Sequence, residues 1–250
     1  MRRYVHGERG CALRPAVLLV LLSFVGLAAA CGEASSGAPG VTVTVLVPTP
    51  TPEAPGPQDL AGFIFPIQEA CLPTGDNLMP NAWRDYRQGI HEGMDFYDVD
   101  NCTPIGPGTE VRAAKGGRVI RADIEYEDLT AAELEELYTR IDELGTSDAQ
   151  TLDRFRGCQV WIDHGRGVVT RYAHLGGLAP GIDEGVTVEQ GQVVGYVGES
   201  GTPESVTNPG TEYHLHFEIR VGESFLGEGL EAEEVRALYE AAFSPRPAPD

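Results

Sequence analysis

From about residue 62 onward, the chain is a succession of short apolar and β-branched runs separated by glycine-rich turns. The runs are GFIFPI, TEVRAAKGGRVIRA, GCQVWIDHG, GVVTRYAHL, VTVEQGQVVGYVGES and YHLHFEIRV. Short, closely spaced runs of this kind are typical of strands that pair with their neighbours through tight turns. We therefore expect a mainly β fold, an antiparallel sandwich or barrel-like domain, and the hydrophobic share of 42% is sufficient for a core.

A helical insertion interrupts the strand pattern. The run DLTAAELEELYTRIDELG carries a capping box at Thr130 and Glu133 and a glycine stop at Gly145. SDAQTLDRFRG reads as a second short helix. We expect an insertion over residues 126–156, between two strands. The apolar stripe of its first helix consists of Leu134, Leu137, Ile141 and Leu144.

A further helix is expected near the C-terminus, in the run LEAEEVRALYEAAF. Its apolar residues recur at helical spacing, so one side of the helix should face the core. The residues expected on that buried side are Leu230, Val235, Leu238 and Phe243.

Residues 1–30 have the pattern of a targeting segment. A positively charged stretch, MRRYVHGERGCALR, precedes the apolar run PAVLLVLLSFVGLAAA. LAAAC resembles the lipobox of bacterial lipoproteins, so we expect a lipoprotein-type signal peptide and a lipid on Cys31. An ordinary secretory signal cut after AAA and a single uncleaved membrane helix are the alternatives. All three predict an exported protein, at the extracytoplasmic face of the membrane or in the cell envelope.

Residues 31–58 are rich in proline, threonine and glycine, and the Pro-Thr repeat favours an extended backbone. We interpret them as a semi-rigid tether, followed by one domain over residues 59–250. The alternative is a strand at VTVTVLV. The formal net charge of −20 argues against a nucleic-acid partner, because the phosphate backbone attracts basic surfaces.

Cysteines of an exported chain can pair. Cys11 lies in the signal segment and Cys31 is the expected lipid site, which leaves an odd number of cysteines in the domain. At most one disulfide can therefore form among those that remain. Cys71 and Cys102 are the favoured pair, because both lie in loop-like stretches that flank the histidine motifs. Cys158 opens an alternating strand and is expected as a buried free thiol.

Two histidines, His214 and His216, lie two residues apart in the run TEYHLHFEIR. Residues two apart in a strand point to the same face of the sheet. Two neutral imidazoles that face the same way suit a metal ion and its bound water. The motif alone is equally compatible with two histidines on a solvated strand face.

The other histidines add two weaker motifs. GIHEGMDFYD places His91 four residues before Asp95, at a strand end or turn, where an imidazole and a carboxylate can converge as zinc ligands. RYAHLGG places His174 at the end of an alternating strand. His164, in WIDHGRG, sits beside a turn and is interpreted as structural.

Taken in order, His-x-x-x-Asp, YAHL and His-x-His resemble the motifs of LytM/lysostaphin-type zinc endopeptidases, which cut the peptides of peptidoglycan. The framing segments GTEVRAAKGGRVIRA, VWIDHGRGVVTRYAHL, GVTVEQGQVVGYVGESG and HLHFEI also look like the strands of this family, in its order. The resemblance covers roughly residues 88–221. The insertion over 126–156 departs from the family pattern, and so does the long segment GTPESVTNPGTEYHLH.

The resemblance implies a LytM-type fold and a role for each residue of the motifs. His91, Asp95 and His216 would be the protein ligands of one zinc ion, with a further position open for water. His214 would act as general base on that water, and His174 would position it or stabilise the oxyanion. The division between the last two stays open, since either histidine could accept the proton.

The function implied is a zinc-dependent endopeptidase that acts on peptidoglycan cross-links or stem peptides. The main alternative is a catalytically silent or autoinhibited relative that binds the cell wall and regulates another hydrolase, with a protein partner. A zinc amidase on the same substrate is a second alternative. GVTVEQGQVVGYVGESG also suggests a biotinyl- or lipoyl-type carrier, but the only lysine, Lys115, lies in a different segment.

Overall fold

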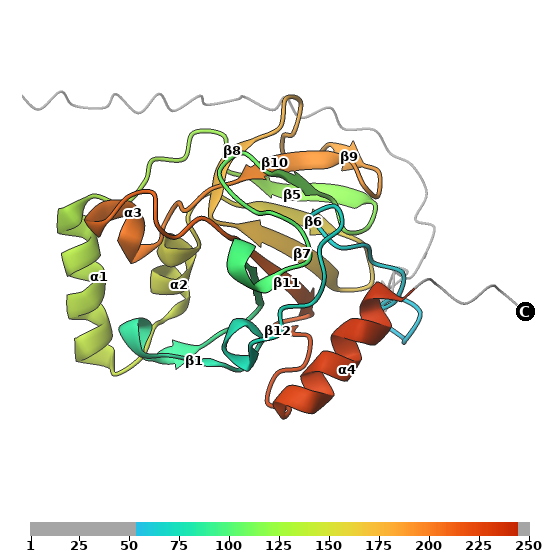
Figure 1. The fold of residues 1–250 in the computed structure, drawn as a ribbon, viewed down its shortest axis with the longest axis horizontal. Helices are drawn as coiled ribbons and strands as arrows, with labels where there is room; N and C mark the ends of the chain where they lie inside the picture. The colour runs from blue at the N-terminus through green and yellow to red at the C-terminus, as the bar shows by residue number, and fades with distance from the viewer. Residues whose placement is uncertain (1–53, 245–250) are drawn as a thin grey trace, which may run out of the picture. The chain divides into compact units, whose positions relative to one another are not determined.

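The computed structural model describes residues 54–244. The expected signal segment, Cys31, the VTVTVLV stretch and nearly all of the tether lie outside these residues. Within them, every pair of neighbouring strands is antiparallel, as expected for a mainly β fold (Figure 1). No helix of the described part has the length and apolar character that crossing a membrane requires.

Two larger sheets and one small hairpin make up the β structure. The seven-stranded sheet has the order β12-β11-β7-β6-β5-β9, with β3 paired to β11. Its strands are β3 (Met94–Phe96), β5 (Gly117–Ala122), β6 (Val160–Asp163), β7 (Val168–Ala173), β9 (Thr187–Val188), β11 (Leu215–Val221) and β12 (Ser224–Phe225). The three-stranded sheet contains β4 (Glu110–Arg112), β10 (Val193–Val197) and β8 (Leu175–Leu178), and the hairpin contains β1 (Trp83–Arg84) and β2 (Gly89–Ile90).

A single apolar core joins the two larger sheets. Val194 and Leu175 from the smaller sheet belong to the same buried cluster as Ile162 and Phe217 from the larger sheet. Alternate residues of β6 and β7 are buried, because successive side chains of a strand point to opposite faces. The sheets stay open at their edges and close no barrel within residues 54–244, so the sandwich-like form of the expected fold is the one observed.

The helical insertion has a small apolar core of its own. Helices α1 (Ala131–Leu144) and α2 (Ala149–Arg156) begin and end close to the predicted positions, and the predicted capping box is present. Gly145 adopts the left-handed conformation expected of a C-terminal stop. Leu134 and Ile141 pack with Phe155 and with Val206 of α3 (Pro203–Thr207), a helix within the long segment before β11.

Some of the predicted buried residues are exposed. Leu144 ends α1 beyond the reach of its small core and is 52% exposed. Leu230, just before α4 (Ala232–Phe243), and Leu238 within it are exposed, whereas the predicted Val235 is buried together with Tyr239 and Ala242. The predicted Phe243 is half-buried and packs against the core, so α4 turns the side with Val235, Tyr239 and Ala242 inward, and only Leu230 and Leu238 of the prediction fall outside it.

The run GFIFPI forms no strand, contrary to expectation. The amide of Phe63 donates to Ala242 in α4, and the amide of Ile64 donates to Ala114 in a loop. The segment therefore crosses the core edge as an extended connection, and it still buries Phe63 and Ile67. Three short 3-10 turns, Asp76–Leu78, Asp85–Arg87 and Asp98–Asp100, complete the N-terminal part of the fold.

The cysteine expectation is confirmed for the described part of the chain. Cys71 and Cys102 form a disulfide, and Cys158 is a buried free thiol. Burial raises the pKa of the Cys158 thiol to about 12. A thiol that stays protonated near neutral pH is a poor nucleophile, which fits a structural role.

Candidate active site

Strand pairing brings two of the predicted metal ligands together. Strand β3 lies antiparallel to β11, and in that register Asp95 is directly opposite His216. Facing residues of neighbouring strands are close enough for their side chains to interact. His91 lies between β2 and β3, and its backbone is held by hydrogen bonds with Asn81 and Ala82.

Gly93 allows the loop that carries His91 to lie flat against β11. A methyl group at this position would come within 2.4 Å of the carbonyl oxygen of Phe217 and within 3.0 Å of the ring of His216. No side chain fits there without moving the backbone. Gly93 is therefore needed for the approach of His91 to His216.

We expect Gly93→Ala to destabilise the fold by about 1–3 kcal/mol, as other overpacked sites do, and to weaken metal binding. The added methyl would push the His91 loop away from β11 and separate the ligands. Urea unfolding and zinc titration measure the two effects. Gly106→Ala is the matched control, because nothing lies within 4 Å of its Cβ position. Equal behaviour of the two variants would contradict this account of Gly93.

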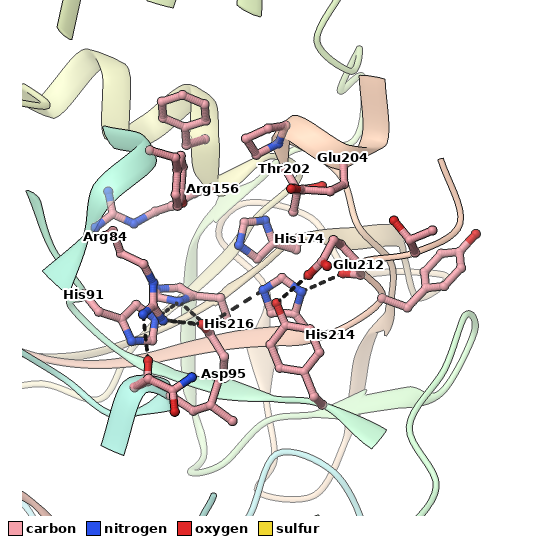
Figure 2. Close-up of a pocket in the computed structure, with 18 of the residues that line it drawn as sticks. Arg84, His91, Asp95, Arg156, His174, Thr202, Glu204, Glu212, His214 and His216 are labelled. Carbon is pink, nitrogen blue, oxygen red and sulfur yellow. Dashed lines mark hydrogen bonds and ion pairs between the residues drawn. The ribbon is translucent and has the colours of Figure 1, made fainter. Parts of the chain in front are cut away.

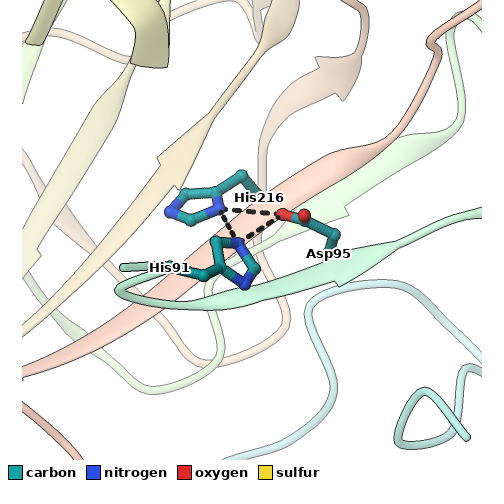
Figure 3. A group of neighbouring side chains, drawn as sticks. All are labelled: His91, Asp95 and His216. Atoms are coloured by element: carbon teal, nitrogen blue, oxygen red, sulfur yellow. Dashed lines mark hydrogen bonds and ion pairs between the residues drawn. The ribbon is translucent and has the colours of Figure 1, made fainter. Parts of the chain in front are cut away.

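Three potential ligand atoms converge on one point between the strands (Figure 3). The Nε2 atom of His91 lies 2.9 Å from Oδ1 of Asp95, and Nδ1 of His216 lies 2.8 Å from the same oxygen. The two ring nitrogens are themselves 2.9 Å apart. All three residues are buried. Two imidazoles and one carboxylate are a donor set that zinc prefers in proteins.

The hydrogen bonds on the outer side of the His91 and His216 rings determine which nitrogen of each ring is unprotonated and faces this point. Nδ1 of His91 donates to the carbonyl oxygen of Met79, at 3.1 Å, and Nε2 of His216 donates to Oε1 of Glu218, at 3.0 Å. In each neutral ring the other nitrogen then carries a lone pair, and both lone pairs point inward. Two lone pairs and a carboxylate oxygen repel one another unless a cation lies between them. The residues present therefore fit a bound metal ion.

Electrostatics set the protonation of the three groups. Burial lowers the pKa of His91 to about 4, so this ring is neutral and able to act as a ligand near pH 7. Burial alone would raise the pKa of Asp95, but His91, His216 and His214 outweigh it and hold that pKa well below its usual value. Burial also opposes the charge on His216, yet the hydrogen bonds that this ring donates to Asp95 and Glu218 raise its pKa. A proton on His216 and a metal ion thus compete for the same place.

His174 lies where the chain passes from one sheet to the other. It connects β7 in the larger sheet to β8 in the smaller one, and its backbone φ of 57° is in the left-handed region. A residue other than glycine is rarely found there, and the conformation costs about 1 kcal/mol or more. The buried ring donates from Nδ1 to the carbonyl oxygen of Ser200, at 2.8 Å. Its Nε2 is therefore an acceptor.

His214 precedes β11, and its imidazole is held on two sides. Nδ1 donates to the carbonyl oxygen of Glu212, at 2.6 Å, and the ring of Tyr97 stacks on it with centroids 4.3 Å apart. Its Nε2 lies 3.9 Å from Oδ1 of Asp95. Burial lowers the pKa of both His214 and His174. Both rings are accordingly neutral near pH 7, each with an unprotonated Nε2.

These residues line a cavity of about 930 Å³ (Figure 2). Residues of the insertion, Tyr138, Leu152 and Phe155, form part of its wall, and Thr202 and Glu204 lie along another part. Figure 2 shows His91, His174, His214 and His216 gathered together with Asp95. The insertion therefore borders the cavity that contains the histidines.

All five predicted site residues thus lie together, whereas His164 does not. His164 bonds the carbonyl oxygen of Gly116 and the hydroxyl of Thr170, in keeping with a structural role. The sequence reasoning missed two residues that contact the ligands. Glu218 follows His214 and His216 on the same strand face, so strand alternation could have identified it. Arg84 donates to Oδ2 of Asp95, at 2.7 Å, and no sequence pattern indicates this contact.

Comparison with known proteins gives a family match over more than half of the chain. The model of the family described as peptidase family M23 matches residues 89–227. No curated protein matches the chain significantly.

Solved structures supply weaker likenesses. A zinc-containing peptidase from Vibrio cholerae is 21% identical with a TM-score of 0.42, over 66% of this chain and 38% of that one. The catalytic domain of the antimicrobial peptidase lysostaphin from Staphylococcus simulans is 20% identical with a TM-score of 0.36, over 62% and 85%. A chain of the SpoIIQ–SpoIIIAH pore-forming complex is 17% identical with a TM-score of 0.40, over 66% and 87%. The present chain therefore spans well under half of the Vibrio cholerae peptidase.

Proposed function

Because this chain belongs to peptidase family M23, we propose that it is a zinc-dependent endopeptidase that hydrolyses peptide bonds in bacterial peptidoglycan. The observation that carries this proposal is the convergence of two inward-facing lone pairs and the Asp95 carboxylate, beside two further neutral histidines, at one cavity. Burial lowers the pKa values of His91, His174 and His214, so each of these three rings has an unprotonated nitrogen.

In this proposal His91, Asp95 and His216 hold one zinc ion. Zinc bound there would supply a Lewis acid that activates water and polarises the scissile carbonyl group. Three protein ligands are the number expected of a catalytic zinc site, since structural sites are usually closed by four. Arg84 orients Asp95, and Met79 and Glu218 fix the tautomers of the two rings.

His214 accepts the proton of the attacking water on Nε2, while its Nδ1–H stays bonded to the carbonyl oxygen of Glu212. The positive charge that develops on this ring is favoured by Asp95, whose Oδ1 is 3.9 Å away. His174 lies beside His214, with ring centroids 4.6 Å apart. From there it positions the water or the substrate oxygen.

The choice of peptidoglycan as substrate rests on the family resemblance of the motifs. The proposed setting is the extracytoplasmic face of the membrane, with residues 1–30 as a lipoprotein-type signal, Cys31 as the lipid site and residues 31–58 as the tether of the peptidase domain. The tether and its anchor would keep the peptidase domain within reach of the wall.

The proposal predicts that the zinc-loaded chain releases peptides from purified peptidoglycan, with new amino ends identified by mass spectrometry. A chelator should abolish the release, and added zinc should restore it, because the proposed reaction depends on zinc held by His91, Asp95 and His216. New ends that persist in chelator would contradict zinc dependence. One-to-one zinc binding without any release would favour a silent regulator. Loss of the sugar–peptide link alone would favour an amidase.

A further inference from the structure

The last residue of the inserted helix α2, Arg156, reaches the residues directly behind the metal ligands. Its Nε donates to Oε1 of Glu218, at 2.6 Å, and its Nη2 donates to Oε2 of Glu92, at 2.5 Å. Glu92 follows His91 in the chain, and Glu218 bonds His216. The guanidinium therefore connects the supports of two ligands that lie 125 residues apart.

Glu218 uses a single oxygen for Arg156 and for His216. Oε1 accepts both the Nε of Arg156 and the Nε2 of His216. The other two arginines near Glu218 contact its second oxygen, Arg171 and Arg220 each at 3.3 Å. Arg156 is thus the only one of the three with a short bond to the oxygen that orients His216. Glu218 is fully buried, so it has no water to replace a lost partner.

The backbone of Arg156 holds a second part of the site, His174. The amide of His174 donates to the carbonyl oxygen of Arg156, at 2.8 Å. Gly157, which has a positive φ of 67°, follows Arg156 and passes so close to Ser200 that a Cβ on Gly157 would lie 2.1 Å from the carbonyl oxygen of Ser200. That same carbonyl oxygen accepts from His174. The end of the insertion is consequently fixed against His174 as well as against Glu218.

We propose that Arg156 is a positioning residue of the metal centre, and that the helical insertion contributes to the site by supplying this residue. The inference rests on the proposed function, in which His216 binds zinc. Arg156 holds Oε1 of Glu218 in place, Glu218 holds the Nε2–H of His216, and the Nδ1 lone pair of His216 then faces the metal. A planar guanidinium can bond Glu92 and Glu218 at once, whereas an ammonium offers a single point charge.

The test compares zinc affinity, by competition with a chelating dye, and the visible absorption spectrum of bound Co²⁺ in the unmodified chain and in four variants. Arg156→Met should lower zinc affinity about 10- to 100-fold, the effect usual for partners that orient a ligand, and should change the Co²⁺ spectrum. Arg156→Lys should recover part of the affinity. Arg171→Met removes a charge from the same carboxylate but leaves Oε1 bonded, so it should leave affinity and spectrum close to those of the unmodified chain.

Arg154→Met is the matched control on the same helix, because Arg154 pairs with Glu133 away from the site. Equal affinities of Arg156→Met and the unmodified chain would overturn the inference and leave the proposed function standing. Equal losses in Arg156→Met and Arg171→Met would also overturn it, since charge alone would then be the cause. If Arg156→Met fails to fold, Arg156→Lys decides, and full affinity with an unchanged spectrum would overturn the inference. An unmodified chain that binds no zinc would overturn both proposals.

Discussion

Replacing His216 with alanine is expected to abolish one-to-one zinc binding and to lower kcat at least about 10³-fold. The variant loses one of only three ligands. It also leaves the buried carboxylates of Asp95 and Glu218 without the imidazole that lies between them. Zinc content by elemental analysis and peptide release from peptidoglycan measure the two effects.

His164→Ala is the matched control for this variant. It removes an imidazole that is also hydrogen-bonded on both nitrogens but lies outside the site. It should keep its zinc and its rate. A His216→Ala variant that retains stoichiometric zinc would contradict the assignment of this ligand, and one that retains activity would contradict the metal centre as the place of catalysis.

Replacing His214 with alanine is expected to lower kcat about 10²- to 10⁴-fold and to leave zinc binding intact. The reason is that His214 offers its Nε2 to the cavity but is not one of the three converging ligands. Steady-state rates on a defined peptidoglycan peptide, with zinc content measured in the same sample, provide the comparison.

His174→Ala decides how the two histidines divide the work. If His214 accepts the proton, His214→Ala should lower kcat more than His174→Ala does. The kcat of the unmodified chain should fall at acid pH, where His214 becomes protonated, and the kcat of His214→Ala should not show this fall. A larger loss in His174→Ala would transfer the role of general base to His174. Loss of zinc from His214→Ala would contradict the proposed ligand set.

The sequence predicts the five site residues far better than it predicts the residues that orient them. His91, Asp95, His174 and the His-x-His pair are close to one another because each occupies the end or the facing position of a strand, and strand periodicity is visible in the sequence. The left-handed backbone of His174 was not foreseen, since it results from the passage between two sheets. Arg156 was not foreseen either, because its partners lie 62 and 64 residues away in the chain.

The errors in the helices have a related cause. The stripes that contain Leu144 and Leu238 have helical spacing, but spacing alone does not show which part of an apolar stripe meets the core. The same holds for GFIFPI, whose composition favours a strand and whose amides find partners in α4 and in a loop instead. In each case tertiary contacts, which the local sequence does not show, determine the outcome.

Anomalous diffraction at the zinc absorption edge, from crystals of the zinc-loaded chain, tests the metal centre most directly. The account predicts one strong peak between Nε2 of His91, the carboxylate of Asp95 and Nδ1 of His216, with His214 and His174 outside bonding distance. A peak at any other group of residues, or none in crystals grown with zinc, would contradict it.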